Sequence, residues 1–88
     1  MTCMSETCST ALVVTDPAGL HLRPAAALAQ IASQFDADVS VEYDGRHADG
    51  KSLLSICMLA AKHGAQLTVS AVGRDAQIAI RAIEGVLA

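Results

Sequence analysis

The amino-acid sequence predicts an α+β fold: a two-layer open-faced sandwich in which a four-stranded, mainly antiparallel sheet carries three helices on one face. Alternating polar and apolar residues mark strands, and apolar residues three and four positions apart mark helices. Their order along the 88 residues is βαββαβα. With 52% hydrophobic and 17% charged residues, the chain can bury one core. We expect a single domain over residues 9–88, preceded by a disordered N-terminal extension over residues 1–8.

The first half of the chain is expected to form a strand, a helix and a hairpin. Residues 10–14 are a short run with β-branched side chains, which favours a strand, and the turn chemistry of residues 16–19 ends it. Residues 28–35 place apolar side chains at i, i+3, i+4 and i+7, the pattern of a helix with one buried stripe. Residues 39–44 alternate as a half-buried strand. Asp-Gly then predicts a hairpin turn into a short edge strand over residues 46–49.

The second half is expected to contribute two further helices and one strand. Ser52 can cap a second helix, which we expect to run to Lys62 or His63 and to stop at Gly64. Residues 67–71 alternate between apolar and polar side chains and predict the fourth strand. A C-terminal helix follows over residues 76–87, because its apolar residues recur at helical spacing.

The second predicted helix is apolar on nearly every side. A short helix on one face of a sheet cannot bury all of its sides. If Ile56, Leu59 and Ala60 face the sheet, the other apolar residues are either exposed or covered by another chain. Scattered surface leucines are common, but a contiguous apolar patch usually marks a protein partner. We prefer the interpretation that this patch is a protein interface. The residues of this predicted patch are Leu53, Leu54 and Cys57.

Composition and charge exclude several classes of function. The formal net charge is −3 and there is no basic stripe, whereas nucleic-acid binding needs clustered lysine and arginine. Base stacking would need more aromatic residues than Phe35 and Tyr43. No apolar run approaches the roughly 20 residues that span a bilayer, and the N-terminus lacks the pattern of a signal peptide. We therefore expect a cytoplasmic protein with no membrane insertion and no nucleic-acid partner.

The three cysteines predict neither a metal site nor a disulfide framework. Cys3 and Cys8 could pair or bind a metal, but a closed zinc site needs about four ligands at tighter spacing. Our preferred interpretation is that both are unpaired thiols in the N-terminal extension, in a reducing compartment. No metal or cofactor is expected.

The candidate chemistry lies in residues 19–25, Gly-Leu-His-Leu-Arg-Pro-Ala. Pro24 favours the first turn of a helix and so places the helix start close to His21. The free N–H groups of that turn, together with Arg23, disfavour an imidazolium but favour a bound phosphoryl group. A neutral imidazole is a competent nucleophile, so His21 can accept such a group. Two other histidines lack these neighbours and are interpreted as surface residues: His47 and His63.

Residues 19–25 resemble the active-site motif of HPr, the histidine-containing phosphocarrier of the bacterial phosphoenolpyruvate-dependent sugar phosphotransferase system. Residues 50–59, Gly-Lys-Ser-Leu-Leu-Ser-Ile-Cys-Met-Leu, are similar to the regulatory-serine segment of that family. Residues 37–39 and 62–65 also match, so the resemblance covers about residues 10–87. The family shares the βαββαβα order, and the resemblance implies an HPr-like phosphocarrier domain.

The resemblance also implies a phosphohistidine cycle. Enzyme I, charged by phosphoenolpyruvate, would phosphorylate His21 on its δ nitrogen, and a IIA domain of a sugar permease would receive the group. Arg23 would bind the phosphoryl oxygens, and Ser52 matches the site of an HPr kinase/phosphorylase. Such a phosphoprotein is a stoichiometric carrier in sugar transport rather than an enzyme, and we expect a monomer. The implied partner-binding residues are Leu22, Pro24, Ala26, Gln30, Leu53, Leu54 and Cys57.

Two departures from the family pattern concern the partners. Leu22 stands where the family usually has alanine, and Gln30 and Ser33 stand where many relatives carry arginine or lysine. We therefore expect weaker affinity for a standard enzyme I. Two alternatives stay open: a regulatory carrier of a nitrogen-related phosphotransferase branch, and a small dimeric ligand-binding regulatory domain in which Gly19 and His21 line an amino-acid site.

Overall fold

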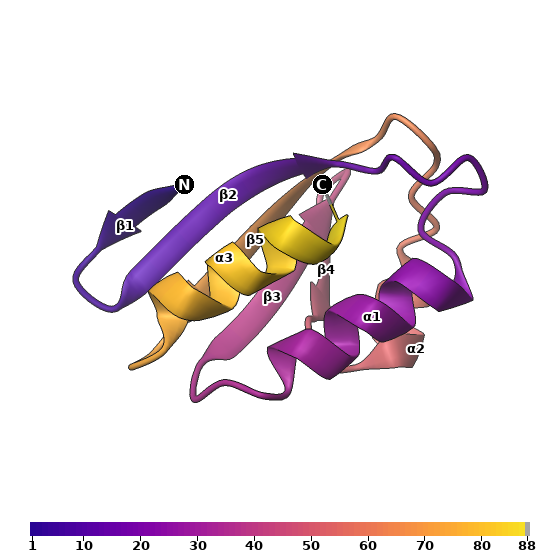
Figure 1. The fold of residues 1–88 in the computed structure, drawn as a ribbon. Helices are drawn as coiled ribbons and strands as arrows, with labels where there is room; N and C mark the ends of the chain where they lie inside the picture. Colours follow the sequence, from indigo (N-terminus) through magenta and orange to yellow (C-terminus); the bar gives the residue numbers. More distant parts are fainter. Residues whose placement is uncertain (88) are drawn as a thin grey trace.

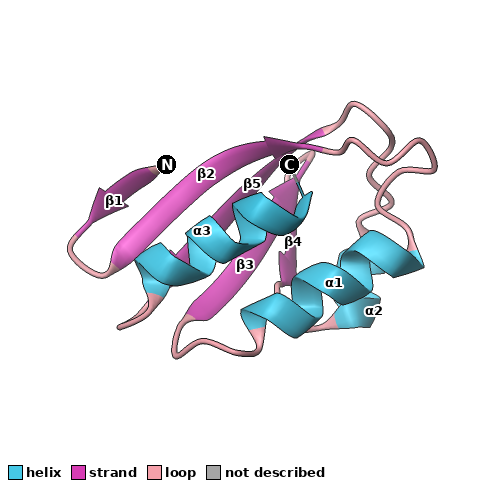
Figure 2. Ribbon diagram, viewed as in Figure 1, coloured by secondary structure: helices cyan, strands magenta, loops and turns pink. Residues whose placement is uncertain are grey.

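The computed structural model describes residues 1–87, in which five strands form one antiparallel sheet and three helices lie on one of its faces (Figures 1 and 2). This confirms the predicted α+β class, but the sheet has five strands where the sequence predicts four. The elements are β1 (Thr2–Met4), β2 (Thr7–Val13), α1 (Leu22–Ala32), β3 (Asp38–Tyr43), β4 (Arg46–Asp49), α2 (Leu53–Met58), β5 (Gln66–Val72) and α3 (Ala76–Leu87).

The sheet has the strand order β1-β2-β5-β3-β4, with every neighbouring pair antiparallel. The central strand β5 lies between β2 and β3, so that Leu67 pairs with Leu12 and Val69 pairs with Val41. All four side chains are buried under the helices. The period-two alternation of the sequence therefore sets which face of the sheet becomes the core.

The fifth strand, β1, comes from the segment expected to be disordered. Residues 2–4 pair with residues 7–9 across a turn in which Ser5 has a φ of 57°. Cys3 lies directly opposite Cys8, their Cα atoms are 4.0 Å apart, and the two form a disulfide. The prediction of unpaired thiols is wrong for this pair, because the turn makes cross-strand neighbours of two cysteines five positions apart. The argument for a reducing compartment loses that support.

Helix α2 ends earlier than the sequence predicts. It stops at Met58, and Ala60 has a φ of 53°, which no right-handed helix tolerates. The cause is tertiary: the Ala61 carbonyl accepts from Leu20 N–H at 2.8 Å, and Gly64 N–H donates to the Val14 carbonyl at 2.8 Å. These bonds hold the segment after α2 against the chain that follows β2. Of the residues expected to face the sheet, Ile56 and Leu59 are buried but Ala60 is exposed.

The core lies between the sheet and the inner faces of the helices. Leu28 of α1 and Ile80 and Ile83 of α3 are fully buried against the strands. Because α1 is anchored in this way, its first turn is held at one end of the molecule, beside the loop that leaves β2 (Figure 1). Within residues 1–87, no helix has the length and hydropathy needed to cross a membrane.

Candidate functional site

His21 is the N-cap residue of α1. Its backbone is extended, with φ −92° and ψ −166°, and its carbonyl accepts the first helical hydrogen bond from Ala25 N–H at 3.0 Å. Its imidazole makes no capping hydrogen bond to the helix. The side chain is 39% exposed. The ring is therefore positioned by the helix start while remaining accessible to a partner.

The first turn of α1 offers two free backbone donors beside His21. Pro24 is the third helical residue, as the sequence predicts, and it has no N–H. Within residues 1–87, no carbonyl or side chain accepts a hydrogen bond from the N–H of Leu22 or Arg23. The unpaired donors and the helix dipole make this turn a favourable place for an anion.

Gly19 lets the loop before α1 approach the segment that follows α2. Its φ is +84°, and a Cβ atom there would lie only 2.7 Å from the Ala61 carbonyl oxygen and 3.2 Å from the Lys62 Cα. Only glycine accepts both the conformation and the contact. The next residue, Leu20, is buried and bonded to Ala61. The position of His21 therefore depends on a long-range contact as well as on its own helix.

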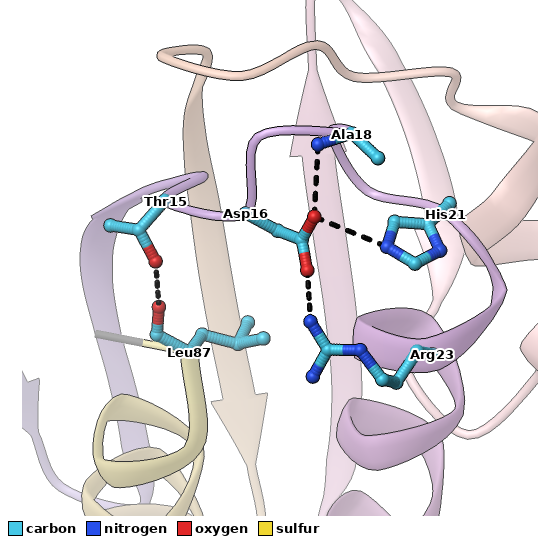
Figure 3. A network of polar contacts seen from close by, with 6 residues as sticks. All are labelled: Thr15, Asp16, Ala18, His21, Arg23 and Leu87. Atoms are coloured by element: carbon cyan, nitrogen blue, oxygen red, sulfur yellow. Dashed lines mark hydrogen bonds and ion pairs between the residues drawn. The ribbon is translucent and has the colours of Figure 1, made fainter.

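Asp16 is a site residue that the sequence analysis missed. Its Oδ1 accepts from Ala18 N–H at 2.9 Å and lies 3.2 Å from His21 Nε2, while its Oδ2 contacts Nη2 of Arg23 (Figure 3). From the sequence alone, this aspartate is predicted only to form part of a turn. The same turn chemistry, an aspartate bonded to the N–H two residues later, is what aims the carboxylate at the histidine.

The surroundings of Asp16 keep it ionised. The hydrogen bond from Ala18 N–H is the main cause that lowers the pKa of the Asp16 carboxyl below its usual value. The contact with His21 and the charge of Arg23 lower it further, while desolvation opposes them. The side chain is 13% exposed, against 77% for Arg23. A fixed carboxylate therefore lies between an imidazole and an exposed guanidinium.

A shallow hollow beside the imidazole brings together residues that are distant in the sequence. It lies between the loop before α1 and the segment that follows α2, and it places Lys62 and His63 near His21. From the sequence, His63 is interpreted as an ordinary surface residue at a helix end. The sequence does not show that α2 ends early, so it does not predict that His63 lies near His21. The hollow is lined by Pro17, Ala18, Leu20, His21, Ala60, Ala61, Lys62 and His63.

Ser52 is the N-cap of α2, as predicted. Its Oγ accepts a hydrogen bond from Ser55 N–H at 3.3 Å. Of the predicted apolar patch, Leu54 is exposed, whereas Leu53 and Cys57 are only half exposed and pack against the core. Met58, which the analysis does not assign to the patch, is 77% exposed. The exposed apolar surface of α2 is therefore centred on Leu54 and Met58.

The remaining predicted partner residues lie on α1, which packs beside α2 (Figure 1). Leu22 is 64% exposed and Gln30 is also exposed, while Pro24 and Ala26 are half-buried. Among the described residues, no three histidine, cysteine, aspartate or glutamate side chains are grouped to hold a metal ion. The chemistry available is a nucleophilic imidazole beside backbone donors and a guanidinium.

Comparisons with known proteins point to one family. The family described as "PTS HPr component phosphorylation site" matches residues 8–88. The phosphocarrier protein HPr of Mycoplasma capricolum subsp. capricolum is 38% identical over 72 residues, 82% of this chain and 81% of that protein.

Two solved structures show how closely the fold is shared. The crystal structure of a phosphocarrier protein HPr from Bacillus anthracis str. Ames has a TM-score of 0.88 and 32% identity, covering 96% of this chain and 100% of that one. An HPr dimer from Thermoanaerobacter tengcongensis has a TM-score of 0.72 and 38% identity, covering 77% and 78%. Dimers therefore occur among the relatives.

The fold, which is shared with a solved phosphocarrier structure at 32% identity, places the chain in the class of phosphocarrier domains. Within that class, the chain belongs to the HPr family of the phosphotransferase system.

Proposed function

We propose that this protein is a cytoplasmic phosphocarrier that accepts a phosphoryl group from phospho-enzyme I on His21 and passes it to a IIA domain of a sugar permease. The observation that carries the proposal is the half-exposed imidazole of His21 at the start of α1, beside the two free N–H groups of Leu22 and Arg23. The protein is modified once in each transfer and acts as a carrier rather than as an enzyme.

The δ nitrogen of His21 attacks the phosphorus atom of the donor. The new N–P bond forms as the bond between phosphorus and the donor breaks, and the electron pair of that bond stays with the donor. The phosphoryl oxygens that arrive at the start of α1 can accept from the N–H of Leu22 and Arg23, groups that face the site before the reaction begins. The guanidinium of Arg23, 77% exposed, can turn from Asp16 to the phosphoryl group and form charge-assisted bonds.

The partner surface we propose combines the start of α1 with the exposed side of α2. Exposed apolar groups on two adjacent helices, Leu22 and Leu54, support it, because such groups at a site usually contact another protein. Arg23 is the basic residue that α1 contributes to this surface, and Lys62 lies in the adjoining hollow. The full proposed set is Leu22, Pro24, Ala26, Gln30, Leu53, Leu54 and Cys57.

Ser52 is the residue we assign to regulation by an HPr kinase/phosphorylase. A phosphate on its Oγ would add a charge of roughly −1.5 to −2 beside Leu53 and Leu54. A partner surface that contacts these leucines would have to desolvate that charge. Negative charge at the N-cap of α2 is compatible with the helix dipole and with the hydrogen bond from Ser55 N–H. We therefore expect phosphorylation to inhibit partner binding without unfolding the helix.

The test is transfer of labelled phosphate from phosphoenolpyruvate through enzyme I. We expect the wild-type protein to take one acid-labile, base-stable phosphoryl group and to pass it to a IIA domain, and we expect His21→Ala to take none. His47→Ala, which removes an exposed imidazole on β4, is the matched control and should behave as wild type. Labelling of His21→Ala at the wild-type rate would refute the assignment.

Two further readouts separate the alternatives. Offering the phosphorylated protein to IIA domains of the sugar branch and of the nitrogen-related branch shows which acceptor discharges it faster; we expect the sugar branch. Sedimentation of the purified protein should give a monomer. A dimer that binds an amino acid and takes no phosphate would instead favour the ligand-binding alternative.

A further inference from the structure

The carboxylate of Asp16 is held in a fixed position between the two charged or titratable groups of the site. Its own backbone carbonyl accepts from Gly19 N–H at 2.9 Å, and its Oδ1 accepts from Ala18 N–H at 2.9 Å, so both the loop and the side chain are constrained. That same Oδ1 lies 3.2 Å from His21 Nε2, within hydrogen-bonding distance. Figure 3 shows the Nε2 edge of the ring facing Asp16, with Nδ1 on the other side of the ring.

We propose that Asp16 is a positioning residue that keeps a proton on His21 Nε2, both before and after Nδ1 is phosphorylated. The inference rests on the proposed phosphocarrier function and deepens it. In the free protein, a carboxylate at Nε2 selects the tautomer whose hydrogen lies on Nε2, because the other tautomer would direct a lone pair at a negative charge. The lone pair is then left on Nδ1, the nitrogen that attacks phosphorus.

The same carboxylate acts on the phosphorylated ring. When Nδ1 bonds to phosphorus, the ring acquires a positive charge that it shares with Nε2–H, and Asp16 neutralises it. In onward transfer the electron pair of the N–P bond returns to Nδ1, and the ring leaves as neutral imidazole if Nε2 has kept its proton. If that proton were lost, the ring would have to leave as an imidazolate, a far poorer leaving group. Retaining the proton therefore makes phospho-His21 a faster donor.

The other charged groups around the ring do not replace Asp16. Arg23 from α1 contacts the opposite oxygen of the carboxylate, and Lys62 and His63 line the hollow from the segment after α2. Each of these, when cationic, disfavours a positively charged ring. From α3, the uncharged Leu87 carbonyl accepts a hydrogen bond from Thr15 Oγ1 at 3.3 Å. The phosphoryl group itself favours the proton, but it lies at Nδ1; Asp16 faces Nε2 directly.

The experiment compares Asp16→Asn with wild type and with Asp38→Asn. Asparagine keeps an acceptor oxygen for Ala18 N–H but removes the charge, and Asp38 is an exposed carboxylate at the start of β3, so the control removes the same charge elsewhere. Each protein is phosphorylated with enzyme I and phosphoenolpyruvate, and in parallel with phosphoramidate. Hydrolysis of phospho-His21 is then followed by phosphorus NMR between mildly acid and mildly alkaline pH.

We expect Asp16→Asn to move the midpoint of this pH profile down by about one unit, because the variant loses the carboxylate that lies 3.2 Å from Nε2 and favours the protonated, phosphorylated ring. Above the wild-type midpoint the phosphorylated variant should hydrolyse about tenfold more slowly. Below both midpoints the two rates should converge, which a merely structural defect would not produce. Asp38→Asn should overlay the wild type throughout.

Nitrogen NMR of the unphosphorylated wild-type protein supplies a measurement that needs no variant and no transfer. We expect the neutral His21 ring to carry its hydrogen on Nε2. A hydrogen on Nδ1, or a pH profile of Asp16→Asn that matches wild type, would overturn the inference. If enzyme I fails to load His21 while phosphoramidate succeeds, the proposed function is wrong, and the role of Asp16 is still decided by the chemically loaded protein.

Discussion

The two helices nearest the proposed site begin in opposite ways. Helix α2 begins at Ser52, whose Oγ accepts from Ser55 N–H at 3.3 Å. Helix α1 begins after His21, whose backbone is also extended but whose side chain makes no capping hydrogen bond. The imidazole instead faces Asp16. The two N-cap residues thus both have extended backbones but different side-chain partners.

This difference teaches what each helix start can do. At α2, a side chain of the protein already satisfies one of the unpaired donors, so the arrangement stabilises a helix of only six residues. At α1, an 11-residue helix is anchored by buried Leu28 and can leave its first donors free. Pro24 removes one donor without filling the site. The N-cap of α2 therefore supports the fold, and the N-cap of α1 is open to a ligand.

Apart from the removal of His21, the substitution Arg23→Ala should have the largest effect on the rate of phosphoryl transfer. If the start of α1 is an anion site, losing its guanidinium removes a contact that is stronger in the transfer state than at rest. We expect a loss of about 2 to 4 kcal/mol of barrier stabilisation, roughly 30- to 1000-fold in the transfer rate from enzyme I. The melting temperature should hardly change, because Arg23 is 77% exposed and exposed ion pairs contribute little.

Arg81→Ala is the matched control for Arg23. It removes an equal charge from the exposed side of α3 and should leave transfer at the wild-type rate. Normal transfer by Arg23→Ala would show that the open start of α1 binds the phosphoryl group through its backbone donors alone.

A smaller effect is expected when negative charge is added at the other helix start. Ser52→Asp places a carboxylate at the cap of α2, beside the exposed Leu54. We expect transfer from enzyme I to His21 to slow at least tenfold, about 1.4 kcal/mol, with the melting temperature held or raised. The measurement sets Ser52→Asp against Ser52→Ala in the same transfer assay.

Ser5→Asp serves as the charge control for this test. Ser5 lies in the turn between β1 and β2 with a φ of 57°, a conformation that aspartate tolerates. It should transfer normally. Equal rates for Ser52→Asp and Ser52→Ala would remove the switch and leave Ser52 as a cap.

Local signals predicted both helix starts but not what surrounds them. Pro24 and the apolar spacing of α1, and the serine before α2, are properties of neighbouring residues. The structure starts α1 next to His21 and caps α2 with Ser52, as the sequence predicts. The end of α2 was predicted too late, because bonds from Leu20 and Gly64 to distant chain positions decide it.

The contribution of Asp16 and the pairing of Cys3 with Cys8 were missed for a related reason. In the sequence, Asp16 has the features of an ordinary turn residue. Only the folded loop shows that its carboxylate contacts the imidazole five positions later. The two cysteines face each other only because β1 turns back on β2. In both cases the contact between the side chains depends on the conformation of a turn. Hydrophobic periodicity does not predict that conformation. The position of His21 beside Arg23 at a helix start was therefore predictable, and the carboxylate of Asp16 beside its imidazole was not.

The smallest expected effect tests the comparison through stability alone. Ser52→Ala removes the oxygen that accepts from Ser55 N–H and should lower the free energy of unfolding by about 1 kcal/mol, or roughly 4 to 8 °C in melting temperature. His21→Ala removes no cap, so we expect a change within about 0.5 kcal/mol, the range of ordinary surface substitutions. Thermal and denaturant unfolding of the two variants, measured together, gives the difference directly.

If His21→Ala proved as destabilising as Ser52→Ala, the imidazole would be stabilising its helix, and the start of α1 would no longer be the one that is open to a ligand. If the difference holds, the residue whose loss is expected to abolish transfer contributes almost nothing to stability, as expected for a side chain whose role is to bind a ligand.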